Sequence, residues 1–330
     1  MMKRREFISL LGGATAMWPL AARAQQADRV RRIGVLMGFA ENDEVWQAYL
    51  AALRQRLQNL GWTDGRNVRI DYRFTGENTE RIRIAAGELV ALAPDVIFVS
   101  TNPAVSALMQ TTRTIPVVFT FVSDSVGSGF VASLARPGGN ITGFHNFEPA
   151  IGGKWLEVLK EIAPGVRRAA VVHVPEITAN VAFLHVAEAV STSLGMTVTA
   201  AGVRDDADIE RVLTAFAHEP NGGLIVAPSP ITTTRRELII ALAARLGLPA
   251  IYSFGFFTTS GGLVSYGIDQ MELVRGAASY VDRILRGANP GELPVQLPTK
   301  YQLAINLKTA KALGLTIPES FLLRADEVIE

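Results

Sequence analysis

The stretch FTFVSDSVGSGFVASLARPGGNITG, from Phe119 to Gly143, has the pattern of a strand, a short helix and the start of a second strand, and it decides how the rest of the chain is interpreted. It begins inside an apolar, β-rich run from Pro116 to Val122. Small polar residues of the kind that cap a helix N-terminus follow at 123–125. The sequence predicts a short helix from Phe130 to Ala135, ended by Pro137 and two glycines. A strand that ends in hydroxyls and a carboxylate and leads into a helix is typical of the ligand-binding edge of an open α/β sheet.

The chain before this stretch alternates strands with helices. Buried strands are predicted at 32–38 and 96–100 and a half-exposed strand at 68–74, each followed by a helical pattern. With the stretch above, the order is β-α-β-α-β-α-β-α-β, which predicts a parallel, doubly wound sheet. Three of the strands end in small polar residues, which should meet at one edge of this sheet. The candidate ligand contacts at these ends, any of which could instead only cap a helix, are Asn42, Asp43, Thr101, Asn102, Ser123 and Asp124.

The chain after Gly143 repeats this plan. Strands are predicted at 168–174, 196–203 and 222–226, separated by helices, and the most aromatic window of the chain lies at 250–257. Two similar units in tandem favour a ligand cleft between two lobes. The candidate contacts in this half, of which the aromatic ones could instead be ordinary core, are Glu176, Ser229, Tyr252, Phe254 and Asp269.

The composition indicates a globular protein and excludes several classes of function. Apolar residues make up 48% of the 330 residues and charged residues 19%, which is enough for two separate cores. Residues 1–24 carry four of the 32 basic and one of the 31 acidic residues, so the remainder has a net charge of −2 and gives no support for nucleic-acid binding. There is no cysteine, the four histidines lack ligand spacing, and no nucleotide-binding, nucleophile-elbow or zinc motif occurs. We therefore expect no metal and no other cofactor.

Residues 1–26 have the features of an export signal. A basic segment precedes an apolar run from about Phe7 to Leu20, which is too short to span a bilayer, and Ala22-Arg23-Ala24 is a small-x-small cleavage site. The pair Arg4-Arg5 shortly before Phe7 favours the twin-arginine route over the general secretory route. We expect a soluble mature protein in the periplasm.

Three segments resemble the solute-binding proteins of ABC transporters. The first is the run Ser-Asp-x-x-G-x-G-x-V-x-S-L-x-x-P-G-G-N-x-T-G, which matches from Ser123 to Gly143 except that the usual proline after the aspartate is Ser125. The second is G-G-L-x-S-Y-G at 261–267, and the third and strongest is the C-terminal segment 293–330. The chain departs from the family at 174–176, where relatives usually have an Asn-Pro pair.

The resemblance covers essentially the whole mature chain and implies a type I periplasmic binding fold with two Rossmann-like lobes. The implied division is a signal peptide at 1–26, an N-terminal lobe at 27–144 plus about 267–292, and a C-terminal lobe at 145–266 plus about 293–330. It also implies that the protein is not an enzyme but delivers a small molecule to an ABC permease in the cytoplasmic membrane. We expect a monomer.

The residue types narrow the chemical class of the ligand. Helix N-termini and hydroxyls suit a carboxylate, and Asp124 or Asp269 could hold an ammonium group. The aromatic window could supply an apolar wall or a cation–π face. These features fit an α-amino acid with an apolar or aromatic side chain, and relatives in the family bind aromatic amino acids. Two alternatives stay open: an exported hydrolase that uses Asp124 and a water in the cleft, and the ligand-binding part of a sensory system.

Overall fold

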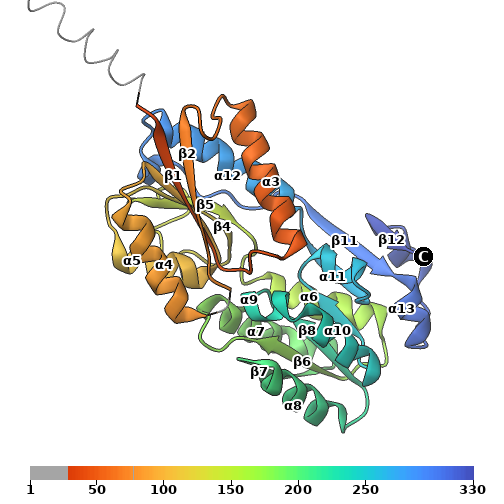
Figure 1. Cartoon of the computed structure of the whole chain (residues 1–330). Helices are drawn as coiled ribbons and strands as arrows, with labels where there is room; N and C mark the ends of the chain where they lie inside the picture. Colours follow the sequence, from red (N-terminus) through yellow and green to blue (C-terminus); the bar gives the residue numbers. More distant parts are fainter. Residues whose placement is uncertain (1–28, 77) are drawn as a thin grey trace, which may run out of the picture.

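The computed structural model describes residues 29–76 and 78–330, and it contains two β-sheets that lie in separate halves of the molecule, upper and lower in Figure 1. The predicted signal peptide lies outside the described residues. Within these ranges, no helix combines the length and the apolar composition that a membrane span requires.

The first sheet has five parallel strands in the order β2-β1-β3-β4-β5, so the predicted doubly wound parallel sheet is confirmed. Its strands are β1 (Arg31–Met37), β2 (Val68–Phe74), β3 (Val96–Ser100), β4 (Val117–Val122) and β5 (Ile141–His145). Helices α3 (Glu44–Asn59) and α12 (Gln270–Leu285) pack in the core on one face, while α4 (Thr79–Ala91) and α5 (Asn102–Thr111) pack in the core on the other. Apolar residues cover both faces of the central strands, which is why these strands are continuous hydrophobic runs.

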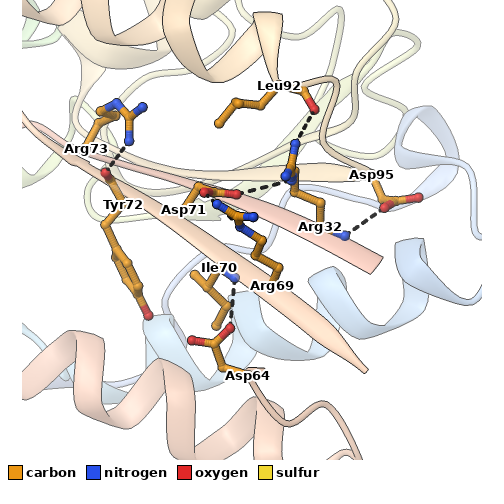
Figure 2. Close-up of polar contacts among 9 residues, drawn as sticks. All are labelled: Arg32, Asp64, Arg69, Ile70, Asp71, Tyr72, Arg73, Leu92 and Asp95. Atoms are coloured by element: carbon orange, nitrogen blue, oxygen red, sulfur yellow. Dashed lines mark hydrogen bonds and ion pairs between the residues drawn. The ribbon is translucent and has the colours of Figure 1, made fainter. Parts of the chain in front are cut away.

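Strand β2 is an edge of the first sheet, and its side chains alternate between two environments (Figure 2). Ile70 and Tyr72 pack against the core that contains α3 and α12. On the opposite face, Asp71 pairs with Arg32 at 3.2 Å and with Arg69 at 3.3 Å. Charged side chains along an edge strand discourage pairing with a strand of another molecule.

The second sheet has seven strands in the order β12-β11-β10-β9-β8-β6-β7. Its strands are β6 (Arg168–His173), β7 (Thr197–Gly202), β8 (Gly222–Val226), β9 (Ala250–Tyr252), β10 (Val264–Ile268), β11 (Tyr301–Asn306) and β12 (Glu327–Ile329). The helices around it are α6 (Ile151–Ile162), α7 (Thr178–Ser191), α8 (Asp206–Ala217), α9 (Pro230–Thr234), α10 (Arg236–Arg245), α11 (Gly255–Thr259), α13 (Leu307–Ala312) and α14 (Glu319–Leu322). Its strands are parallel except for the pair β10–β11.

The antiparallel pair follows from how the chain crosses between the two halves. After β10 the chain leaves the second sheet, forms α12 on the first sheet, and returns as an extended segment that leads into β11. On its way back, Gln296 donates its backbone N–H to Gly143 O (2.9 Å) and accepts from His145 N–H (2.9 Å). Since this return is not a helical crossover on the second sheet, β11 is free to run antiparallel to β10.

The predicted helix from Phe130 to Ala135 is wrong, because this segment is an irregular loop. The backbone N–H groups of Phe130 and Val131 both donate to Ser125 O, at 2.8 and 3.3 Å, and Ala132 N–H donates to Pro137 O. Leu134 O accepts from Val295 N–H at 2.7 Å. These bonds to turns and to a distant segment replace a helical ladder, which is marginal for so short a segment.

Candidate ligand-binding site

The carboxyl ends of β1, β3 and β4 meet at one edge of the first sheet, as predicted. Ser100 Oγ accepts from Gly38 N–H at 3.2 Å. Asn102, which follows β3, is bonded to the residue that follows β4. Its Nδ2 donates to Ser123 O (2.8 Å) and its Oδ1 accepts from Ser123 N–H (3.1 Å). These bonds fix the loops after the strands, and with them Thr101 and Ser123.

A narrow cavity of about 20 Å³ lies where these loops face the loops at the ends of β6, β8 and β9. It is large enough for about one water molecule. Residues from both halves line it: Phe39, Trp46, Thr101, Asn102, Pro103, Phe121, Ser123 and Asn146 from the first, and Ile177, Asn180, Pro228, Ser229, Pro230, Thr233 and Phe254 from the second.

Aromatic rings form much of the wall. Trp46 lies in the first turn of α3, where Asp43 caps the helix by accepting from Val45 N–H at 3.0 Å. The Trp46 ring stacks on Phe39 with 3.4 Å between ring centroids and meets the edge of Phe121 at 4.7 Å. Across the cavity, Phe254 stacks on Phe256. This wall can hold a flat apolar group by stacking and edge contacts.

Three polar atoms of the first half are buried at the cavity without a hydrogen-bond partner: Trp46 Nε1, Thr101 Oγ1 and Asn146 Oδ1. A buried polar atom without a partner costs about 1–3 kcal/mol, so such atoms call for an explanation. Thr101 also has a φ of +79°, which is uncommon for a β-branched residue and is the kind of strain found at ligand sites. One N–H donor, one hydroxyl and one amide oxygen of residues that line the cavity are therefore without a protein partner.

Two polar side chains that line the cavity from the second half, Asn180 and Ser229, are bonded within that half. Asn180 Oδ1 accepts from Val174 N–H (3.0 Å), and its Nδ2 donates to Pro228 O (2.9 Å). Ser229 and Thr232 form a reciprocal capping box at the start of α9. The hydrogen bonds of Asn180 and Ser229 thus stabilise the loops of this wall.

No charged side chain among the described residues lines the cavity. Asp43 and Arg236 form an ion pair across the two halves, with their Oδ2 and Nη1 atoms 2.9 Å apart. These two charges neutralise each other, so neither is free to pair with an ionic group.

An outer groove of about 480 Å³ continues from the cavity and shares Asn102, Pro103, Ile177 and Pro230 with it. Glu176 lies on this groove and pairs with Arg204 at 2.6 Å, both side chains being more than half exposed.

The structure brings together five of the residues predicted from sequence as ligand contacts. The cavity is lined by Thr101, Asn102, Ser123, Ser229 and Phe254. Asp43 lies beside it in the ion pair, and Glu176 lies in the outer groove.

The other four candidates lie elsewhere. Asn42 is exposed. Asp124 closes a turn by accepting from Gly127 N–H at 2.9 Å, and Asp269 caps α12 by accepting from Met271 N–H at 2.9 Å. Tyr252 is 1% exposed and stacks on Phe257 in the core of the second half.

Sequence reasoning missed the residues that complete the cavity, of which the most informative are Phe39, Trp46, Phe121, Asn146 and Asn180. Two signals were available. Asn146 directly follows strand β5, like the polar residues after β3 and β4, and Asn180 is an amide in the first turn of α7, next to Ala179 and Val181. For the aromatic residues no local signal existed, because an aromatic residue at a strand end or in a first helical turn usually belongs to the core.

Ser125, His145 and Glu148 are arranged in the order of a nucleophile, base and acid. Ser125 Oγ lies 2.6 Å from His145 Nε2, and His145 Nδ1 lies 3.4 Å from Glu148 Oε1. However, Ser125 is fully buried and is not among the residues that line the cavity, and burial lowers the pKa of His145 to about 4. These contacts give no support to a hydrolase, because no substrate reaches the hydroxyl.

Comparisons with known proteins agree with this architecture. The sequence profile described as ABC transporter substrate binding protein matches residues 34–329. The tyrosine-binding protein of Clostridioides difficile (strain R20291) is 25% identical over 266 residues, which cover 78% of this chain and 74% of the relative.

Two solved structures are similar over 91% of this chain. A conserved domain protein of Vibrio cholerae has a TM-score of 0.85 at 28% identity and is covered over its full length, 100%. An ABC domain from Streptococcus pneumonia in complex with L-Trp has a TM-score of 0.83 at 26% identity and is covered over 99%. These neighbours confirm the predicted two-lobed, type I periplasmic binding fold. With both the profile match and the fold in agreement, the chain belongs to the ABC transporter substrate binding protein family.

Proposed function

We propose that this chain binds an α-amino acid with an aromatic side chain in the cavity between its two halves. The observation that carries the proposal is the set of unpartnered polar atoms on Trp46, Thr101 and Asn146, three residues of a cavity lining that is rich in aromatic rings. An aromatic amino acid has charged polar groups that can bond these unpartnered atoms and an apolar ring that can stack on the aromatic wall. The neutral charge of the lining suits a zwitterion with an uncharged side chain.

Each group has a distinct role in this proposal. The Thr101 hydroxyl lies at the N-terminus of α5 and would donate to the ligand carboxylate, which the helix N-terminus also favours. Asn146 Oδ1 would accept from the ammonium group, and the Trp46 ring would contact the ligand side chain. The relatives support the aromatic class, because one is named a tyrosine-binding protein and another is solved with L-Trp.

The cavity is too small for such a ligand as it stands, at about 20 Å³. Binding therefore requires the halves to separate and then to close around the ligand, or the rings of Phe39 and Trp46 to move apart. We infer that the division at 27–144 plus about 267–292 and 145–266 plus about 293–330 describes the two bodies that move.

Titration calorimetry on the mature protein, after mass spectrometry of any small molecule that copurifies, tests the proposal. L-Trp, L-Tyr and L-Phe should bind, whereas tryptamine (no carboxylate) and indole-3-propionate (no ammonium) should bind at least about tenfold more weakly, because each leaves one polar group unmatched. L-Glu and L-Lys serve as charged controls. Binding of these two as tight as that of L-Trp, or no binding of any aromatic amino acid, would contradict the proposal.

We further propose that the chain is exported, acts as a monomer, and delivers its ligand to an ABC permease. The Arg4-Arg5 pair motivates the twin-arginine route. If this route is used, changing both residues to Lys should leave precursor in the cytoplasm, detected by immunoblot of cell fractions. Normal periplasmic amounts would instead indicate the general secretory route. Light scattering on the purified protein tests the monomer, and loss of amino-acid uptake after deletion of a neighbouring permease gene tests the transport role.

A further inference from the structure

Asp43 and Arg236 form an ion pair that joins the two halves beside the cavity. Asp43 is the N-cap of α3 in the first half, and Arg236 is the first residue of α10 in the second. Asp43 Oδ2 and Arg236 Nη1 lie 2.9 Å apart, and the side chains are only 11% and 17% exposed.

Each partner is also bonded to a wall of the cavity. The second carboxylate oxygen of Asp43 holds the first turn of α3, which contains Trp46. Arg236 Nη1 also donates to Thr233 O at 3.2 Å, and Thr233 lines the cavity. The guanidinium lies 6.0 Å from the centre of the Phe256 ring, which stacks on Phe254. The pair therefore connects Trp46 on one side of the cavity with Thr233 on the other.

This pair differs in burial from ion pairs such as Arg204–Glu176 and Arg324–Glu161, whose side chains are 40–59% exposed. Exposed pairs contribute little, because water and salt screen them and two long side chains lose freedom. A pair that is largely shielded from water is screened less, and it is lost whenever the two halves move apart.

We propose that Asp43 and Arg236 are a clasp that holds the two halves closed and slows release of the ligand. The two side chains are positioning residues that do not touch the ligand. The part of the inference that concerns release rests on the proposed function, whereas the part that concerns closure does not. Opening breaks the pair, so the clasp raises the barrier to dissociation.

The first experiment measures closure without any ligand. The chain contains no cysteine, so spin labels can be placed at Ile84→Cys on α4 and Glu210→Cys on α8, both of which are exposed. Distances between the labels are measured by pulsed electron resonance in the parent and in Asp43→Asn, Arg236→Gln and the double variant. Asn caps a helix as well as Asp does, so Asp43→Asn removes the charge and retains the cap. We expect the population with short distances to fall severalfold in each variant.

The second experiment measures ligand kinetics by stopped flow with L-Trp as the probe. We expect each single variant to release L-Trp about tenfold faster with little change in association rate, since the pair forms only on closure. The double variant should be no faster than either single variant, because the second substitution removes a partner of an interaction that is already lost.

The matched control is Arg324→Gln, which breaks an exposed ion pair within the second half and should change neither distances nor release. Thermal melting verifies that each variant is folded. Unchanged distances in both single variants, or effects that multiply in the double variant, would overturn the clasp. If the distances lengthen as expected but no aromatic amino acid binds, the clasp stands and the proposed ligand class is wrong.

Discussion

The two walls of the cavity are built from the same kind of element, loops at the carboxyl ends of parallel strands. They differ in whether their buried polar groups have hydrogen-bond partners. On the first wall, Thr101 Oγ1 and Asn146 Oδ1 are buried without partners. On the second wall, Asn180 uses both ends of its amide within its own half. The first wall thus has polar atoms that are free to bond, whereas Asn180 of the second wall is already bonded within its own half. The comparison predicts that substitutions on the first wall change affinity and that substitutions on the second change stability.

The largest effect is expected from Thr101→Val, which removes the unpartnered hydroxyl and retains the shape. A hydrogen bond to a charged ligand group contributes about 1.5–3 kcal/mol, so affinity for L-Trp should fall roughly tenfold to a hundredfold. Stability should change little, because the hydroxyl has no partner in the protein. Titration calorimetry and thermal melting check both parts. The matched control is Thr142→Val. In the parent, the Thr142 hydroxyl donates to Leu293 O at 2.6 Å and is buried away from the cavity. This control should lose stability and keep its affinity, and the reverse result for the two variants would contradict the comparison.

Asn180→Ala should produce the opposite pattern. It leaves Val174 N–H and Pro228 O without their partners, so the free energy of unfolding should fall by about 2 kcal/mol. Urea unfolding measures this loss. Affinity for L-Trp should change by less than about threefold. A tenfold loss of affinity in a variant that is still folded would mean that Asn180 contacts the ligand.

Trp46→Phe sharpens the comparison within the first wall. It retains an aromatic ring and removes the unpartnered Nε1 donor. The loss of a single hydrogen bond of about 0.5–1.5 kcal/mol predicts an affinity roughly two- to tenfold lower. Calorimetry with L-Trp and tryptamine locates the bond, because only L-Trp should lose affinity if Nε1 donates to the carboxylate. An equal loss for both ligands would assign Nε1 to another part of the ligand.

The smallest effect is expected from Asp124→Asn. The side chain closes a turn through Gly127 N–H, and Asn can accept the same bond. Its φ of +47° also suits Asn. Affinity should therefore change by less than about twofold, with Asp269→Asn as a second carboxylate outside the cavity. A loss of tenfold or more in either variant would support the ammonium-binding role that the sequence suggested for these two residues.

Much of the fold could be predicted from the sequence because local patterns of apolar and polar residues determine which helices and strands form. Apolar runs such as 96–100 and 117–122 have the length and composition of buried strands, and the alternation with helices requires parallel sheets. The polar residues after those strands must then gather at one edge. For this reason Thr101, Asn102 and Ser123, which line the cavity, could be selected as candidates from the sequence. The failed helix at 130–135 marks the limit of this reasoning, since a bond from Val295 N–H to Leu134 O is invisible locally.

Only the tertiary structure decided which of these residues line the cavity. Thr101 and Asp124 both follow a buried strand and precede a turn or helix, so their local patterns do not separate them. In the folded chain one hydroxyl is buried unpartnered at the cavity, while the carboxylate closes its own turn. Likewise, Trp46 and Arg236 acquire their roles only when α3 and α10, which belong to different halves, are brought together. The physical reason is that sequence periodicity determines which elements form, whereas a binding site depends on side chains that are far apart along the chain and meet only after those elements pack.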